Sequence, residues 1–282
     1  MVKKIFAQIY IWLILLFMYI PILVLIAFSF TTSVNVGVWT GFSFDLYPAL
    51  FQDGEIMAAL GNTLIIAFIS SAVSVLLGTA GAIGAFYSKK RAMRALDSVN
   101  QIPVVNAEIV MALSLTVMFV FVGSYIFRGA NLFSFWTLLI GHVVLSAPFV
   151  YLSIKPKLQQ MDPNLYEAAL DLGATPRSAL YRVTLPQILP GILSGFLLSF
   201  TLSLDDFIIT TFTRGPGLLN GQGTIETLST LVQAKIKKGP IPPEMRALTT
   251  IIFLVVLLLV VGVTLYRYFH KDKKHSRRRM AR

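Results

Sequence analysis

The chain has 282 residues, of which 56% are hydrophobic and 13% charged, and it carries a net charge of +11 without any cysteine. This composition excludes a soluble domain of that length and predicts an all-α polytopic membrane protein, while the lack of cysteine excludes disulfides, thiolate metal sites and thiol nucleophiles. The basic residues flank apolar runs or lie in the tail 271–282, so we expect a lipid bilayer as their partner and no nucleic acid.

Six apolar runs are long enough to cross a hydrocarbon core of about 30 Å. The whole chain is therefore expected to form one transmembrane domain, 1–282. Lys3 and Lys4 precede the first run, which is too long for a signal peptide and is expected to remain as a membrane helix. The predicted spans are 5–30, 62–87, 103–122, 132–154, 188–212 and 247–269.

Lysine and arginine predict the orientation, because they concentrate in cytoplasmic loops. They precede the first span, fill the second and fourth loops and crowd the tail, whereas the first loop has none and the third has only Arg128. Both termini are thus expected in the cytoplasm. The loop 213–246 is basic although this orientation places it outside, and the rule weakens for long loops.

The second predicted span carries small residues every four positions, at Ser70, Ser74, Gly78 and Ala82. This spacing places them on one helix face, where another helix can approach closely. We therefore interpret the stripe as a packing seam.

The segment 155–186 lies between the fourth and fifth spans, on the predicted cytoplasmic side, and its sequence indicates two short helices. Asp162 followed by Pro163 is a start signal for the first helix, and Gly173 is a left-handed stop. Thr175 and Pro176 repeat the start signal for a second helix, which is expected to end near Leu185-Pro186. Because Leu165, Ala169 and Leu172 fall on one face outside the bilayer, this hairpin is expected to bind a protein partner.

The same segment contains Glu167-Ala168-Ala169, then Gly173, then Val183 and Leu185-Pro186. This spacing resembles the EAA-x3-G-x9-I-x-LP signature of the membrane subunits of bacterial ABC importers, with Val183 in place of isoleucine. The resemblance implies the six-helix fold of type I importer permeases. It also implies that the segment is a coupling helix, docked in a groove of a cytoplasmic ATPase subunit through Glu167, Ala168, Ala169, Gly173, Val183, Leu185 and Pro186.

Further stretches, beginning at Trp39, Glu108, Ser199 and Pro243, resemble the second permease subunits of spermidine/putrescine importers. That resemblance implies polyamine uptake across the bacterial cytoplasmic membrane. It implies as partners two copies of an ATP-binding cassette ATPase, a second homologous permease in a heterodimer and an extracytoplasmic substrate-binding protein. The choice between spermidine, putrescine and another small substrate stays open.

Three carboxylates lie within the predicted spans, at Glu108, Asp205 and Asp206. A charge at the centre of a membrane helix costs roughly 2.5–3.5 kcal/mol, so each calls for an explanation. Asp206 shares a helical stripe with Ser203 and Thr210, whereas Asp205 is rotated by about 100°, so that only one of the pair can lead a contact with substrate. Glu108 is expected near the cytoplasmic end of its span, and the aspartates are expected in the outer half of theirs.

Two interpretations of these carboxylates stay open. They can offset the desolvation of a cationic substrate along a path between subunits, or they can serve as helix caps and interhelical hydrogen bonds. His142 is interpreted as a hydrogen-bonded packing residue, and the aromatic residues at span ends, Trp39, Tyr47 and Trp136, as anchors at the membrane surface.

The chain contains neither an H-E-x-x-H zinc motif nor a G-x-x-x-x-G-K-[ST] phosphate loop. We therefore expect a non-catalytic subunit without cofactor, whose ATP is hydrolysed by partner subunits. Two alternatives to an importer stay open at this point. An ion-driven secondary carrier would explain the buried carboxylates but not the capped hairpin, and a membrane scaffold would not transport at all.

Overall fold

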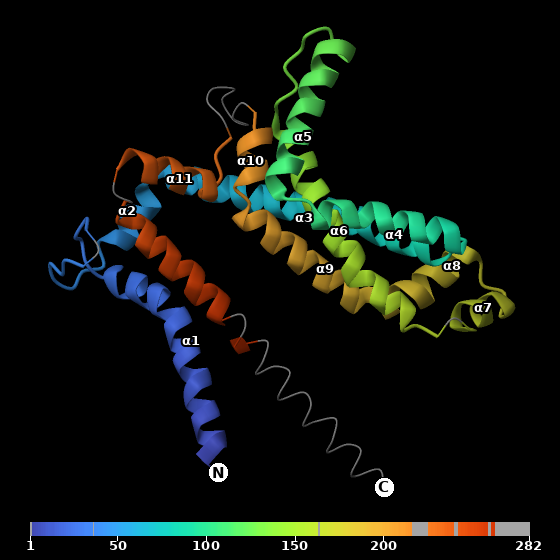
Figure 1. The fold of residues 1–282 in the computed structure, drawn as a ribbon, viewed down its shortest axis with the longest axis horizontal. Coiled ribbons are helices and arrows are strands. Elements are labelled where there is room, and N and C mark those ends of the chain that lie inside the picture. The colour runs from blue at the N-terminus through green and yellow to red at the C-terminus, as the bar shows by residue number, and fades with distance from the viewer. Residues whose placement is uncertain are drawn as a thin grey trace. The chain divides into compact units, whose positions relative to one another are not determined.

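The computed structural model describes residues 2–35, 37–162, 164–215, 225–239, 242–258 and 261–262. Helices and short connections make up all of this described part, which confirms the all-α prediction (Figure 1). Two compact units can be distinguished, one formed by 1–57 with 234–282 and the other by 58–233. The candidate site lies in the second unit.

The helices follow one another without an intervening sheet. In chain order they are α1 (Val2–Phe28), α2 (Leu46–Gln52), α3 (Gly54–Phe86), α4 (Lys90–Val105), α5 (Glu108–Phe121), the π-helical turn η1 (Val122–Ile126), α6 (Phe135–Gln159), α7 (Asn164–Asp171), α8 (Pro176–Ala179), the π-helical turn η2 (Leu180–Thr184), α9 (Leu185–Asp205), α10 (Ile208–Thr213) and α11 (Leu228–Lys238). Residues 244–258 are helical as well.

Five helical stretches in the described part are long and apolar enough to cross a membrane: Gln8–Phe28, Gly54–Phe86, Glu108–Ile126, Phe135–Gln159 and Pro176–Asp205. They correspond to the first five predicted spans. The sixth prediction, 247–269, begins within the helix 244–258, and the rest of it falls largely outside the described residues.

The third span begins later than the sequence predicts. A single helix over 103–122 was expected, but α4 ends at Val105, and Asn106 and Ala107 take extended backbone before α5 begins at Glu108. The chain therefore enters this span through a separate amphipathic helix. The apolar run hides the break because neither Asn106 nor Ala107 is a strong helix breaker.

Helix α4 is held against α6 by polar contacts. Asp97 Oδ1 accepts hydrogen bonds from Tyr151 Oη at 2.6 Å and from Lys155 Nζ at 2.7 Å, while Asn100 Nδ2 donates to the Pro148 carbonyl at 3.3 Å. The hydrogen bonds from Lys155 and Tyr151 lower the pKa of Asp97, so its carboxylate is charged at neutral pH. These contacts fix the polar end of α4 alongside α6.

The seam of small residues on α3 is confirmed, and its partner is α6. Ser70, Ser74 and Ala82 are buried, and the Ser74 and Ser146 hydroxyls lie 2.7 Å apart. A Cβ atom added at Gly78 would come within 2.8 Å of Val150, so only glycine permits this approach of the two helices. Small side chains thus let α3 and α6 pack closely, as in other membrane helix pairs.

Helix α6 forms the centre of the second unit. One face contributes Val150, Tyr151, Ile154 and Leu158 to an apolar cluster with α3 and α9. Towards its other end α6 packs against α5 and α10, whose buried side chains include Leu115, Phe119 and Ile209. Figure 1 shows α7 at the lower right of this unit and α5 rising at its top.

The first unit is held by an arginine and an aromatic cluster. The Arg246 guanidinium donates to the carbonyls of Phe28, Ser33 and Val34. Ring contacts link Phe28, Phe30, Trp39, Phe42, Phe44 and Tyr47. The interpretation of Trp39, Tyr47 and Trp136 as membrane-surface anchors stays a prediction.

Candidate functional site

The first half of the candidate coupling segment is the helix α7. Asp162 Oδ1 accepts a hydrogen bond from the Asn164 amide at 3.0 Å, as expected of a residue that starts a helix; Pro163 lies outside the described residues. Gly173 has a φ of +86°, and the Ala174 amide donates to the Ala169 carbonyl at 3.0 Å. The predicted left-handed stop at Gly173 is therefore confirmed.

The second half starts as predicted but does not end as predicted. Thr175 Oγ1 accepts a hydrogen bond from the Ser178 amide at 3.3 Å, with Pro176 in the first turn of α8. The expected end near Leu185-Pro186 is wrong, because the helix continues through η2 into α9. In the wider turn the Leu185 amide bonds to the Leu180 carbonyl, five residues back, just before Pro186 breaks the regular pattern.

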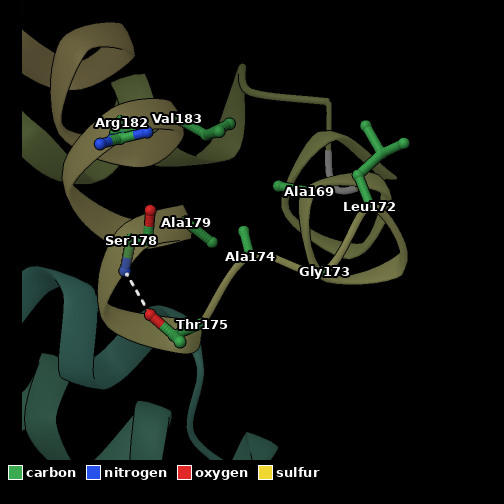
Figure 2. Close-up of a pocket in the computed structure, with 9 residues that line it drawn as sticks. All are labelled: Ala169, Leu172, Gly173, Ala174, Thr175, Ser178, Ala179, Arg182 and Val183. Atoms are coloured by element: carbon green, nitrogen blue, oxygen red, sulfur yellow. Dashed lines mark hydrogen bonds between the residues drawn. The ribbon is translucent and has the colours of Figure 1, made fainter.

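A hollow of about 540 Å³ separates α7 from α8 and η2 (Figure 2). The methyl groups of Ala169, Ala174 and Ala179 face this hollow, with Arg182 and Val183 on its far wall. Leu172 is 89% exposed beside the hollow, although it is apolar.

The other predicted coupling residues surround this hollow or adjoin it. Glu167 and Ala168 are exposed, Ala169 and Val183 are half-buried, and Gly173 is exposed. Leu185 and Pro186 lie one turn further on, at the start of α9. The fold thus brings Ala169, Gly173 and Val183 together.

Helix α7 also contacts Tyr87, the residue that directly follows α3, and the sequence did not reveal this contact. The rings of Tyr87 and Tyr166 lie with their centroids 5.1 Å apart, and the Tyr87 hydroxyl lies 3.3 Å from Thr184 Oγ1. Tyr87 directly follows α3, so the hairpin is joined to the membrane helices at α3 as well as through its own chain. No periodic signal marks this single residue.

The three predicted carboxylates meet at a second break, between α9 and α10. Asp205 ends α9 and is exposed, whereas Asp206 is 4% exposed. Asp206 Oδ1 accepts from the Ile209 amide at 3.2 Å, and Oδ2 accepts from both the Thr210 amide and the Thr210 hydroxyl at 2.8 Å. Asp206 therefore stabilises the break from the position before the N-cap residue Phe207, by accepting hydrogen bonds from amides in the first turn of α10. This agrees with the helix-capping interpretation, one of the two left open.

Glu108 lies beside these aspartates rather than at a different depth. Its carboxyl group is close enough to those of Asp206 and Asp205 for their charges to interact. The expected separation of Glu108 from the aspartates is wrong, because it assumed one straight helix from Pro103. The break at 106–107 places the start of α5 level with the end of α9.

His142 completes the surroundings of Asp206. The imidazole is fully buried, 2.7 Å from Ser203 Oγ through Nδ1 and 3.0 Å from Thr210 Oγ1 through Nε2. Its interpretation as a hydrogen-bonded packing residue is confirmed. The stripe of Ser203, Asp206 and Thr210 was visible in the sequence, but its contact with His142 was not.

The chain matches one family model over residues 74–275, and the description of that family is binding-protein-dependent transport system inner membrane component. Among curated proteins it is 33% identical over 223 residues to the spermidine/putrescine transport system permease protein PotC of Haemophilus influenzae, covering 79% of this chain and 81% of PotC. It is 34% identical over 218 residues to the putrescine transport system permease protein PotI of Escherichia coli, covering 77% and 74% of the two chains.

Solved structures show the same fold. A chain of a bacterial alginate ABC transporter, solved in complex with an alginate pentasaccharide-bound periplasmic protein, superposes with a TM-score of 0.69. That match covers 92% of this chain and 91% of the other at 19% identity. A chain of a bacterial ABC transporter involved in alginate import matches with a TM-score of 0.68 at 15% identity, covering 95% and 96%.

The family match covers more than half of the chain, and the curated relatives span most of it. Permeases of this family work with a substrate-binding protein and with ATPase subunits, so the alternatives of an ion-driven carrier and of a scaffold are not retained. The chain belongs to the binding-protein-dependent transport system inner membrane components, and it is a non-catalytic permease subunit of an ABC importer.

Proposed function

We propose that this permease imports polyamines, with the segment 155–186 coupling it to the ATPase and Glu108, Asp205 and Asp206 contributing to the substrate path. The observation that carries the coupling role is the capped hairpin, whose exposed small-residue surface around Ala169 and Gly173 borders an open hollow. A polyamine substrate is supported by the similarity of the chain to PotC, a spermidine/putrescine permease protein, and to PotI, a putrescine permease protein.

The coupling proposal follows from how the hairpin is attached. Helix α8 continues through η2 into α9, so a displacement at Gly173 reaches Asp205 along one helical stretch, Pro176–Asp205. The Tyr87–Tyr166 contact carries the same displacement to α3. An ATPase subunit that binds Glu167, Ala168, Ala169 and Gly173 would therefore move two membrane helices together.

The path proposal assigns different parts to the three carboxylates. Asp205 is exposed and Glu108 is partly exposed, so both can meet an ammonium group of a polyamine. Asp206 is buried and already accepts three hydrogen bonds, so it acts on the path through the position of its neighbours. The carboxylates of Glu108 and Asp205 together would offset the cost of removing water from a doubly charged polyamine.

The remaining parts of the assembly are proposed from the sequence. A second, homologous permease would complete the path as a heterodimer, with two ATPase copies beneath and a substrate-binding protein outside. The basic loops and tail support an orientation with both termini in the cytoplasm of the bacterium. In this orientation the hairpin faces the ATPase subunits.

Reconstitution of the complete complex in proteoliposomes tests the substrate class. With the binding protein present, putrescine or spermidine is expected to stimulate ATP hydrolysis and to accumulate inside, because a cationic path favours both. An uncharged sugar and an acidic sugar polymer serve as controls. ATP-driven uptake of a control compound, without response to either polyamine, would overturn the polyamine proposal while leaving the coupling role intact.

A further inference from the structure

A chain of buried hydrogen bonds supports the break between α9 and α10 from behind. It runs from α3 through α9 and α6 to α10, and its members are Ser70, Ser203, His142, Thr210 and Asp206. The four residues other than Asp206 are at most 3% exposed. Buried polar groups in membrane helices are costly unless paired, so such a chain fixes the helices that it links.

The direction of the hydrogen bonds can be read from the Asp206 end. The Thr210 hydroxyl has a single hydrogen to donate. Apart from His142, the acceptors that it reaches are two oxygens of Asp206, Oδ2 at 2.8 Å and the backbone carbonyl at 3.4 Å. Thr210 Oγ1 can then only accept from His142, 3.0 Å away. Nε2 of His142 therefore carries a hydrogen.

The other end of the chain fixes the second ring nitrogen. The Ser70 hydroxyl lies within donating distance of both the Ala67 carbonyl, at 3.2 Å, and Ser203 Oγ, at 3.0 Å. Ser203 Oγ in turn lies 2.7 Å from His142 Nδ1, which is the acceptor for the Ser203 hydrogen. Nδ1 thus accepts and carries no hydrogen. These directions assign a neutral imidazole in the Nε2–H form, in which the hydrogen bonds of Ser203, His142 and Thr210 point towards the Asp206 carboxyl group.

We propose that His142 is a positioning residue, whose Nε2–H holds Thr210 and, through the Thr210 hydroxyl, Asp206. It thereby holds the α9–α10 break that presents Asp205 to the substrate. Ser229 supports the same turn by donating to the Asp206 carbonyl at 2.6 Å. The effect of His142 on transport rests on the proposed function. The protonation of the His142 ring nitrogens and the geometry of the break do not depend on the proposed function.

Two variants of His142 separate positioning from packing. Glutamine can place its amide nitrogen near the position of Nε2 and keep the donor to Thr210. Asparagine is shorter, and its amide reaches only the position of Nδ1. In the complete complex, His142→Gln is expected to keep the putrescine concentration for half-maximal uptake within about threefold of wild type, and His142→Asn to raise it by about tenfold or more.

Assembly of the complex and its basal ATP hydrolysis are measured for both variants, so that a variant that fails to fold is recognised. A residue that only fills space predicts equal effects of glutamine and asparagine, or a larger effect of glutamine. Either result would overturn the positioning role. If the wild-type complex does not transport polyamines, the proposed function is wrong. The inferred hydrogen-bond directions are then tested by the protonation of the His142 ring nitrogens.

Nitrogen NMR of the histidine-labelled complex at neutral pH reads the ring directly. The chain has three histidines, and a difference spectrum between wild type and His142→Gln isolates the signals of His142. A protonated Nε2 together with an unprotonated Nδ1 is expected. An imidazolium, or a hydrogen on Nδ1, would contradict the inferred direction of the hydrogen bonds.

Discussion

Gly173→Val is expected to lower substrate uptake by about tenfold or more while the complex still assembles and hydrolyses ATP. Gly173 has a φ of +86°, a conformation that a β-branched residue adopts only at a cost of roughly 1–2 kcal/mol. A cost of 1.4 kcal/mol corresponds to about tenfold in an equilibrium constant. The turn would then relax, and α7 would no longer present Ala169 in the same direction.

Two controls separate the coupling role from a general loss of stability. A Cβ atom at Gly173 meets nothing within 4 Å, so the variant is expected to fold. Gly129 has a φ of +88° and equally open surroundings, in the connection between η1 and α6. Gly129→Val introduces the same strain there and is expected to leave uptake unchanged. Normal uptake by Gly173→Val, or equal loss in both variants, would count against the coupling role.

Asp205→Asn is expected to weaken polyamine uptake and Asp206→Asn to lower the stability of the complex, although the two residues are adjacent. Asp205 is exposed at the break, so its loss should raise the half-saturating polyamine concentration by about tenfold without lowering the melting temperature of the complex. Asp206 is buried and accepts three hydrogen bonds. An asparagine there has one acceptor oxygen, so the complex should lose stability by about 2 kcal/mol or more.

Uptake of labelled putrescine and thermal unfolding of the purified complex distinguish these outcomes. Asp45→Asn is a matched control, because Asp45 is an exposed carboxylate of the first unit, and its side chain makes no cap hydrogen bond. It is expected to change neither quantity. Unchanged transport kinetics in Asp205→Asn would remove that carboxylate from the path.

The sequence predicted those features that depend on local backbone chemistry. Gly173 stops α7 because only a left-handed residue without Cβ strain closes that turn, and Thr175 caps the next helix with its hydroxyl. The seam around Gly78 was predicted because small residues recur at every fourth position of the second span. Each of these signals lies within a few positions of its effect.

The two helix breaks could not be predicted in the same way. Residues 106–107 and 206–207 contain neither glycine nor proline, and the apolar runs continue on both sides. At 206 the break is stabilised by hydrogen bonds from Ile209 and Thr210 and by a histidine more than 60 positions away in the chain. Because the breaks set the depth of each helix, the meeting of Glu108 with Asp206 could not be read from the spans.

The π-helical turn η2 escaped prediction for a related reason. Leu185-Pro186 is typical of a helix start, and the sequence suggested that one helix ends there before another begins. The structure absorbs Pro186 in a continuous helix by widening the preceding turn. The difference matters for the proposed coupling, because a continuous helix transmits motion from α8 to α9 and a loop would not.

Cross-linking from a single cysteine tests the coupling role most directly, because the chain has no cysteine of its own. Ala169→Cys places a thiol on α7 and Leu172→Cys places one directly after α7, both at the hollow, and Tyr125→Cys places one on η1, where the side chain is 77% exposed. In the intact complex, a short thiol-to-amine reagent is expected to join either position at the hollow to the ATPase subunit, and not Tyr125→Cys. Failure of both positions at the hollow to capture the ATPase, under conditions in which the complex transports, would contradict the coupling role.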